Sequence, residues 1–283
     1  MPDFPIIDSH VHLFDTERLR YSWLVRRPGI NRPHLFPDYL QATKGVNVEK
    51  LVFAEVWVDP HLNLAEAEWL AEQASLHPAI VGMIAAVPLE NGRAVLNDVA
   101  RLQNHPTFRA VRRITEAEVD ERFCEQERFV EAVRSVGDLG IVCDVCVFAH
   151  QLPGVVSLAR QCPNTMIVLD HIGKPAIRHN DIEQWRNDIR ALSGLPNVAT
   201  KISGVLTEAD QRSWSRDIVR PYLDHVIECF GFDRIMFGSD WPVLALTTSI
   251  QEWVDIVDWT VKGCDASDIS RLYRDNAARI YKL

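Results

Sequence analysis

The feature that most constrains the fold is a regular alternation of short apolar runs with amphipathic stretches along the whole chain. Several runs are rich in Val and Ile and nearly continuous in apolarity, which is typical of parallel strands buried on both faces. The segments between them carry apolar residues at helical spacing. The expected strands are Ile6–His12, Leu51–Val58, Ile80–Val87, Phe108–Thr115, Gly140–Phe148, Met166–His171, Val198–Gly204 and Ile235–Asp240.

Strands that alternate with helices in this number predict an α/β protein with a single (β/α)8 TIM barrel. The length of 283 residues agrees, because such a barrel occupies roughly 250 residues. A doubly wound open sheet is the alternative, but no Gly-x-Gly-x-x-Gly follows the first strand and there is no Walker loop. We therefore expect residues 1–283 to form one domain. The long irregular stretch 18–38, which contains three prolines, is expected to cover the active site.

Charge and apolar patterning exclude several classes of partner. The chain has 39 acidic and 30 basic side chains, a formal net charge of −9, which argues against a nucleic-acid surface and against docking to anionic lipid. No stretch approaches the ~20 apolar residues of a membrane helix. The N-terminus lacks the features of a secretory signal, so a cytoplasmic location is expected. Cys143 and Cys146 lie three apart on an expected strand, face opposite sides, and are interpreted as small buried hydrophobes.

Polar side chains stand at the ends of three expected strands, where the active site of a barrel lies. His10 and His12 are two residues apart, so both imidazoles face the same side and can hold one metal ion or one substrate. His171 ends the sixth strand and Asp240 ends the eighth. A carboxylate near imidazoles in a shielded site is suited to take a proton from water. The alternative for Asp240 is a helix cap.

This ordered set of residues resembles the amidohydrolase superfamily. Three segments are more narrowly similar to its lactonase group, which acts on fucono-, rhamnono- and galactono-lactones and on pyrone dicarboxylates. The resemblance extends from the first strand to the final helix. The three segments are Leu169-Asp-His-Ile-Gly-Lys-Pro175, Lys201-Ile-Ser-Gly204 and Phe237-Gly-Ser-Asp-Trp-Pro242.

The resemblance implies a metal site and a catalytic base. His10, His12 and Asp240 would surround one divalent metal, such as zinc, and Asp240 would activate the hydrolytic water. Metal-dependent amidohydrolases usually add a histidine at the end of the fifth strand, whereas here His150 lies two residues beyond that strand. Two imidazoles and one carboxylate can complete a mononuclear zinc site with water. A hydrolase that works without metal stays open as the alternative.

Further polar and aromatic residues are expected to bind the substrate. A lysine inside a strand and a glutamate at the end of an apolar run both need partners. Of Arg112 and its neighbour Arg113 only one can point inward, and the resemblance favours Arg112. The expected substrate-binding residues are Arg112, Lys201, Glu55, Trp241 and Trp23.

These features together predict a hydrolase that opens the ring of a small lactone, with a sugar lactone as the first candidate. Asp240 would take a proton from the attacking water, while a metal or cationic groups, His171 among them, would stabilise the oxyanion. Three alternatives remain: a lactonase for a pyrone or muconolactone-type carboxylate, a metal-dependent decarboxylase of the same superfamily, and a barrel that binds a sugar acid without catalysis. A dicarboxylate would need at least two cationic anchors. The sequence also leaves a homo-oligomer open.

Overall fold

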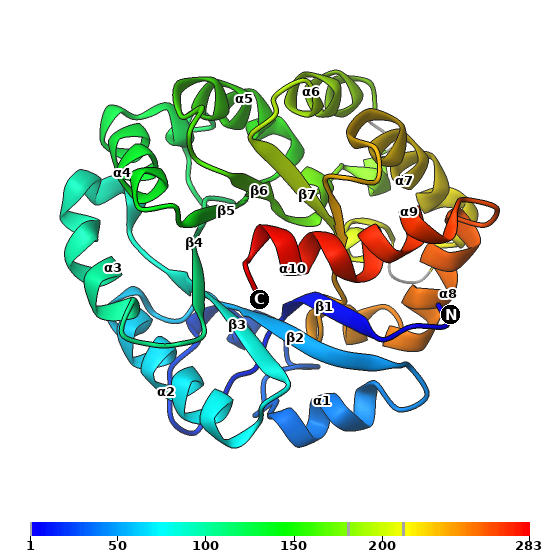
Figure 1. The fold of residues 1–283 in the computed structure, drawn as a ribbon, viewed down its shortest axis with the longest axis horizontal. Helices are drawn as coiled ribbons and strands as arrows, with labels where there is room; N and C mark the ends of the chain where they lie inside the picture. The colour runs from blue at the N-terminus through cyan, green and yellow to red at the C-terminus, as the bar shows by residue number, and fades with distance from the viewer. Residues whose placement is uncertain (1, 180–181, 211–212) are drawn as a thin grey trace.

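The computed structural model describes residues 2–179, 182–210 and 213–283, and its strands form one parallel barrel (Figure 1). The strands follow one another around the barrel in sequence order. The prediction of a single (β/α)8 barrel is confirmed. The strands are β1 (Ile6–Val11), β2 (Val48–Ala54), β3 (Ile80–Ala86), β4 (Phe108–Ile114), β5 (Val142–Cys146), β6 (Ile167–Leu169), β7 (Val198–Ile202) and β8 (Ile235–Phe237).

Helices surround the barrel, and the C-terminal helices cross one end of it, so that the C-terminus lies near the barrel axis (Figure 1). No helix in the described part of the chain has the length and apolar character needed to span a bilayer. The helices are α1 (Phe36–Ala42), α2 (Asn63–Leu76), α3 (Leu96–Leu102), α4 (Glu127–Asp138), α5 (Leu152–Gln161), α6 (Glu183–Ser193), α7 (Arg216–Phe230), α8 (Ile250–Thr260), α9 (Ala266–Ser270) and α10 (Asn276–Ile280).

Helix α10 seals the barrel end at which the strands begin. Apart from Met236, the inward side chains there are small or branched apolar groups, and they pack against Ala277, Ile280 and Tyr281. This inner core is separate from the larger apolar layer between the strands and the surrounding helices. The inward side chains are Ile7, Val52, Ala54, Ile84, Ala110, Val142, Val168, Ala199 and Met236.

The barrel closes between β1 and the segment that follows β8. The backbone N–H of Asp240 donates to the carbonyl of His10 at 2.9 Å, and the N–H of His12 donates to the carbonyl of Trp241 at 2.8 Å. These two bonds place residues from opposite ends of the chain side by side. The closure therefore brings the Asp240 carboxylate to the two first-strand histidines.

The prediction that the sixth and eighth strands extend to His171 and Asp240 is wrong. Strand β6 ends at Leu169 and β8 ends at Phe237. His171 lies in the short helical segment Asp170–Gly173 and Asp240 in the irregular segment after β8, and both have positive φ, 53° for His171 and 60° for Asp240. The tight approach of the β8 segment to β1 helps to explain the early end. A Cβ on Gly238 would lie 2.8 Å from the Cβ of His10, so only glycine fits there.

Candidate active site

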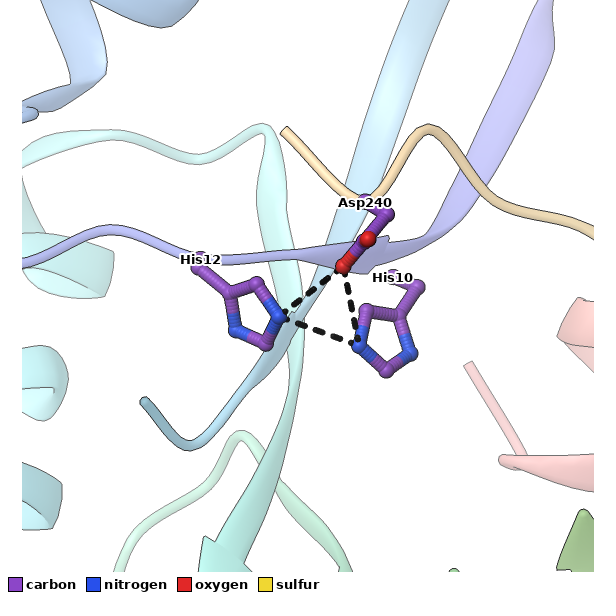
Figure 2. A group of neighbouring side chains, drawn as sticks. All are labelled: His10, His12 and Asp240. Atoms are coloured by element: carbon purple, nitrogen blue, oxygen red, sulfur yellow. Dashed lines mark hydrogen bonds and ion pairs between the residues drawn. The ribbon is translucent and has the colours of Figure 1, made fainter. Parts of the chain in front are cut away.

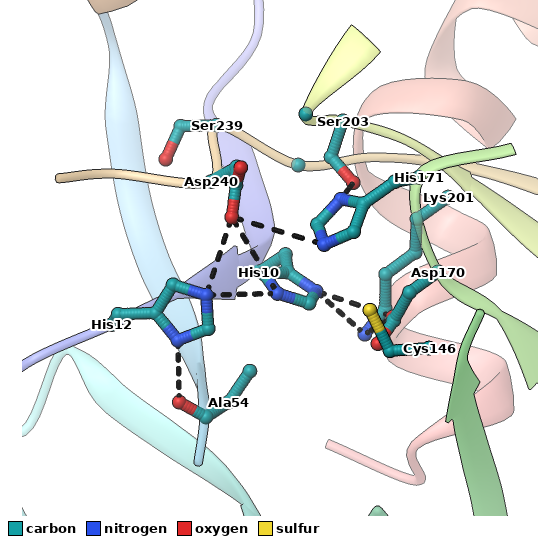
Figure 3. A network of polar contacts seen from close by, with 12 residues as sticks. His10, His12, Ala54, Cys146, Asp170, His171, Lys201, Ser203, Ser239 and Asp240 are labelled. Atoms are coloured by element: carbon teal, nitrogen blue, oxygen red, sulfur yellow. Dashed lines mark hydrogen bonds and ion pairs between the residues drawn. The ribbon is translucent and has the colours of Figure 1, made fainter. Parts of the chain in front are cut away.

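Three imidazoles and one carboxylate meet at the end of the barrel where the strands stop (Figure 3). Figure 2 shows His10, His12 and Asp240 of this cluster from close by. The Nε2 atoms of His10 and His12 are 3.2 Å apart. Asp240 Oδ1 lies 3.2 Å from His12 Nε2 and 3.8 Å from His10 Nε2. His171 Nε2 lies 3.9 Å from the same carboxylate oxygen. The structure thus brings together the four residues that the sequence predicts as metal ligands or catalytic groups.

The outer nitrogens of the histidines are held by neighbouring groups (Figure 3). His12 Nδ1 lies 2.8 Å from the carbonyl oxygen of Ala54. A carbonyl only accepts, so Nδ1 carries a proton and Nε2 is the nitrogen of His12 that faces the cluster. His171 Nδ1 is held by the Ser203 hydroxyl at 2.9 Å. Metal-binding histidines are oriented by this kind of bond.

This donor set fits a divalent metal. The ligand atoms of His10, His12 and Asp240 all lie within 4.8 Å of one another, and all three residues are buried. Two nitrogen lone pairs that face each other at short distance repel unless a proton or a cation lies between them. Imidazole nitrogens and one carboxylate oxygen are ligands that zinc prefers. His150, in contrast, lies at the cavity wall and stacks on Phe148, outside the cluster.

The electrostatic surroundings keep Asp240 ionised. Burial by itself raises the pKa of this carboxyl, but His171 and a hydrogen bond with His12 outweigh burial and hold its pKa below the usual value. Burial lowers the pKa of His171 to about 4, so its ring is neutral at pH 7. An ionised carboxylate beside neutral imidazoles can accept a proton from water.

Arg112 lies within the barrel and is held between two carboxylates. Its Nε donates to Asp170 Oδ2 at 2.6 Å and its Nη1 donates to Glu55 Oε1 at 3.0 Å. All three residues are buried. Arg113 points outward and pairs with Glu90, which confirms that only Arg112 faces inward.

Lys201 lies deeper, below the histidine cluster, and is fully buried. Its Nζ contacts Asp144 Oδ2 at 2.5 Å, Asp170 Oδ1 at 3.1 Å and His10 Nδ1 at 3.1 Å. Burial by itself raises the pKa of Asp170, but Lys201 and Arg112 outweigh burial and hold its pKa well below the usual value. Lys201 therefore contacts His10 at Nδ1, the ring nitrogen that faces away from His12.

A cavity of about 940 Å³ opens above the cluster. Six of the predicted site residues line it: His12, Trp23, Glu55, Arg112, His171 and Asp240. The other three predicted residues, His10, Lys201 and Trp241, do not belong to the cavity wall as far as the structure describes it. Trp241 is buried and packs against Tyr39 and His34, with ring centroids 5.6 and 5.3 Å away.

Within the irregular stretch 18–38, a short helical turn, Ser22–Arg26, contributes to the cavity. Trp23, Arg26 and Arg27 line the wall there. The Trp23 indole N–H donates to the carbonyl of Val56 at 2.7 Å, which fixes the ring in place. The stretch therefore supplies an aromatic surface and two guanidinium groups to the cavity.

Sequence reasoning missed a charged group on the cavity wall. Lys174 Nζ lies 2.7 Å from Glu116 Oε1 and 3.5 Å from Glu208 Oε1. The Cys146 thiol donates to the same Glu116 oxygen at 2.9 Å. Lys174 lies in the segment Leu169–Pro175 that carries the family resemblance, and that was the one sequence feature that could have identified it.

The prediction that Cys143 and Cys146 face opposite sides is confirmed. Cys143 packs in the outer core while Cys146 lines the cavity, and all six cysteines are free.

A parallel barrel with its polar cluster at the ends of the strands has the active-site arrangement of barrel enzymes, and the histidine–aspartate cluster is the one that the resemblance to the amidohydrolase superfamily implies. The chain belongs to the amidohydrolase family Amidohydro_2, whose model matches residues 7–283.

Relatives of known name agree with the lactonase group. The chain is 32% identical to L-fucono-1,5-lactonase of Burkholderia multivorans, over 98% of this chain and 96% of that protein. It is 22% identical to L-rhamnono-gamma-lactonase of Scheffersomyces stipitis, over the full length of both. The crystal structure of a Burkholderia multivorans amidohydrolase with bound zinc matches with a TM-score of 0.89 at 29% identity, over 99% of this chain and 100% of that chain. These findings confirm the resemblance.

Proposed function

We propose that this protein hydrolyses the lactone of a sugar acid and opens its ring to the hydroxy acid. The observation that carries the proposal is the ionised Asp240 beside three imidazoles at the base of a large cavity. Overall similarity to L-fucono-1,5-lactonase supports the same reaction class.

In the proposed mechanism, Asp240 takes a proton from water as the water attacks the lactone carbonyl carbon. The ring C–O bond then breaks, and the protonated Asp240 returns the proton to the departing alkoxide. His171, on the other side of Asp240 from His12 (Figure 3), orients the water or the carbonyl oxygen. A zinc ion held by His10, His12 and Asp240 would stabilise negative charge on the carbonyl oxygen.

The charges on the cavity wall favour a neutral, hydroxyl-rich ring. Glu55 and Glu116 can accept hydrogen bonds from sugar hydroxyls, whereas Arg112 and Lys174 are each engaged by two carboxylates. Lys201 acts on the site through His10 in this proposal, because it does not line the cavity. A lactone that carries a carboxylate is the second candidate, favoured by Arg26, Arg27 and Arg178 at the cavity wall.

The function is tested with matched aldonolactones and pyrone dicarboxylates, with acid release followed by a pH indicator. We expect turnover of the aldonolactones with the higher kcat/KM. Turnover of the dicarboxylates alone would assign the protein to the second candidate. A folded protein that opens none of these lactones would contradict the proposal.

The metal site gives a prediction that does not depend on turnover. We expect the purified protein to bind about one zinc ion per chain, and His12→Gln to lose most of it, because His12 Nε2 faces the cluster. His150→Gln is the matched control, since His150 lines the cavity outside the cluster. Metal analysis after dialysis measures the content. Equal zinc in the two variants would exclude His12 as a ligand.

Trp23 gives a prediction about substrate affinity. Its ring lines the cavity and is held by the bond to Val56, so a sugar ring can pack on it. We expect Trp23→Ala to raise KM by about 10-fold, the equivalent of ~1.4 kcal/mol, with little change in kcat. Trp259→Ala is the control, because Trp259 lies outside the cavity between Arg216 and Arg220. Similar KM values for the two variants would refute a role of Trp23 in binding.

A further inference from the structure

The chain ends at the base of the active-site network. Tyr281 directly follows α10 and is almost fully buried in the inner core. That hydroxyl donates to Asp144 Oδ2 at 2.7 Å. The Tyr281 ring centroid lies 5.4 Å from Lys201 Nζ. The last helix thus contacts the charged layer beneath the histidine cluster.

A continuous series of polar contacts leads from this hydroxyl to the cluster. Asp144 Oδ2 also accepts from Lys201 Nζ at 2.5 Å, and Lys201 Nζ lies 3.1 Å from His10 Nδ1. The other nitrogen of His10 faces His12 at 3.2 Å. Figure 3 shows Lys201 and Asp170 together at the outer nitrogen of His10.

The position of Lys201 decides which nitrogen of His10 carries the proton. If Lys201 donates to Nδ1, the proton lies on Nε2, which then cannot bind a cation. If Nδ1 donates instead to Asp170 Oδ1, which lies 3.3 Å away, the Nε2 lone pair faces the cavity. Asp144 and Asp170 both attract the Lys201 ammonium. A firmly held Asp144 draws the ammonium away from Nδ1 and favours the second arrangement.

Asp144 depends on Tyr281 for its position. Its Oδ1 has no hydrogen-bond partner within the described structure, so the bonds from Lys201 and Tyr281 to Oδ2 are its anchors. Without the hydroxyl, Asp144 keeps only its contact with the Lys201 ammonium. We infer that Tyr281 is a positioning residue of the active site, which acts through Asp144 and Lys201 on the tautomer of His10; its kinetic consequence rests on the proposed function.

A second tyrosine in the same C-terminal segment provides a matched control. Tyr273 is fully buried, and its hydroxyl donates to Asp258 Oδ1 at 2.7 Å. Its ring packs against Phe237 in the outer core, away from the inner core. Tyr281→Phe and Tyr273→Phe therefore each remove a hydrogen bond from a buried tyrosine to an aspartate, and only the first bond lies in the series that leads to His10.

The experiment compares the two variants in metal-free protein by NMR of the histidine ring nitrogens, with the His10 signals assigned by their loss in His10→Gln. We expect Tyr281→Phe to shift the His10 signals toward the Nε2-protonated form and to weaken zinc retention against a chelator by about 10-fold. In a turnover assay it lowers kcat with little change in KM. Tyr273→Phe leaves all of these at the wild-type values.

His10 signals and zinc retention that match wild type in Tyr281→Phe would overturn the inference, even if thermal stability fell. If Tyr281→Phe does not fold, Asp144→Asn tests the same link, because it releases Lys201 while retaining an acceptor for the tyrosine. Unchanged His10 signals in Asp144→Asn would overturn the inference equally. These readouts need no turnover, so an enzyme that opened no lactone would contradict the proposed function alone.

Discussion

Asp240→Asn is expected to lower kcat by about 10³-fold while the barrel stays folded. The structure places this carboxylate, buried and held in the ionised form, 3.2 Å from His12 and 3.9 Å from His171. An amide of the same size preserves the packing, but it cannot accept a proton from water at neutral pH. The loss should therefore appear in kcat, measured at saturating lactone, and far less in thermal stability.

Two controls separate this loss from trivial causes. Asp224→Asn removes the same charge from an exposed ion pair with Arg220 and should leave kcat unchanged. Zinc content is measured in the same Asp240→Asn samples, because Asp240 also lies in the candidate metal cluster. Zinc retained without turnover assigns the loss to proton transfer, and zinc lost assigns it to the ligand role. A variant that kept more than about a tenth of the wild-type kcat would refute Asp240 as the base.

The barrel and its upper histidines were predictable because they follow from local periodicity. Buried parallel strands appear as apolar runs, and two residues on one strand share a face. His10 and His12 were therefore expected to face the same side, and in the structure their Nε2 atoms are 3.2 Å apart. Family resemblance supplied the partners from distant strands, His171 and Asp240.

The depth of an inward side chain along the barrel axis was not predictable in the same way. Lys201 and Arg112 both point inward, as strand alternation requires, yet Arg112 lines the cavity while Lys201 is enclosed below it. That difference depends on the stagger between strands and on two carboxylates, Asp144 on β5 and Asp170 directly after β6. Tyr281 gave no signal either, because its role depends on where the last helix packs.

Backbone conformation at the two candidate catalytic positions was not predictable from the sequence pattern either. His171 and Asp240 adopt positive φ, a backbone conformation that residues other than glycine rarely adopt. Such strain is stored where the surrounding structure fixes it, often at functional sites. Here the closure of β8 onto β1 through the Asp240 and His12 amides fixes the turn at Asp240. That closure depends on the whole barrel, so no local pattern reports it.

The largest effect on stability is expected for Lys201→Met. Lys201 is fully buried and is the cation that joins Asp144 to Asp170. Its removal takes away the ammonium that pairs with Asp144, and burial already raises the pKa of this carboxyl to about 6. Breaking a buried ion pair in this way costs about 3–5 kcal/mol of folding free energy. At roughly 2–4 °C per kcal/mol, Tm should fall by about 10 °C.

The control and the rescue make this prediction specific. Arg113→Met removes a cation from the outer, partly exposed face of β4, where it pairs with Glu90 and Glu118, and should cost about 1 kcal/mol or less. Adding Asp144→Asn to Lys201→Met replaces the carboxyl group that has lost its ammonium partner with a neutral amide. The double variant should recover a substantial part of the decrease in Tm, because the two changes act on one contact. Tm is measured by calorimetry on metal-free protein, so that zinc binding does not enter the comparison. If Lys201→Met melted at the same temperature as Arg113→Met, the buried lysine would contribute nothing beyond a surface ion pair, and the support of His10 from beneath would have to come from Asp170 alone.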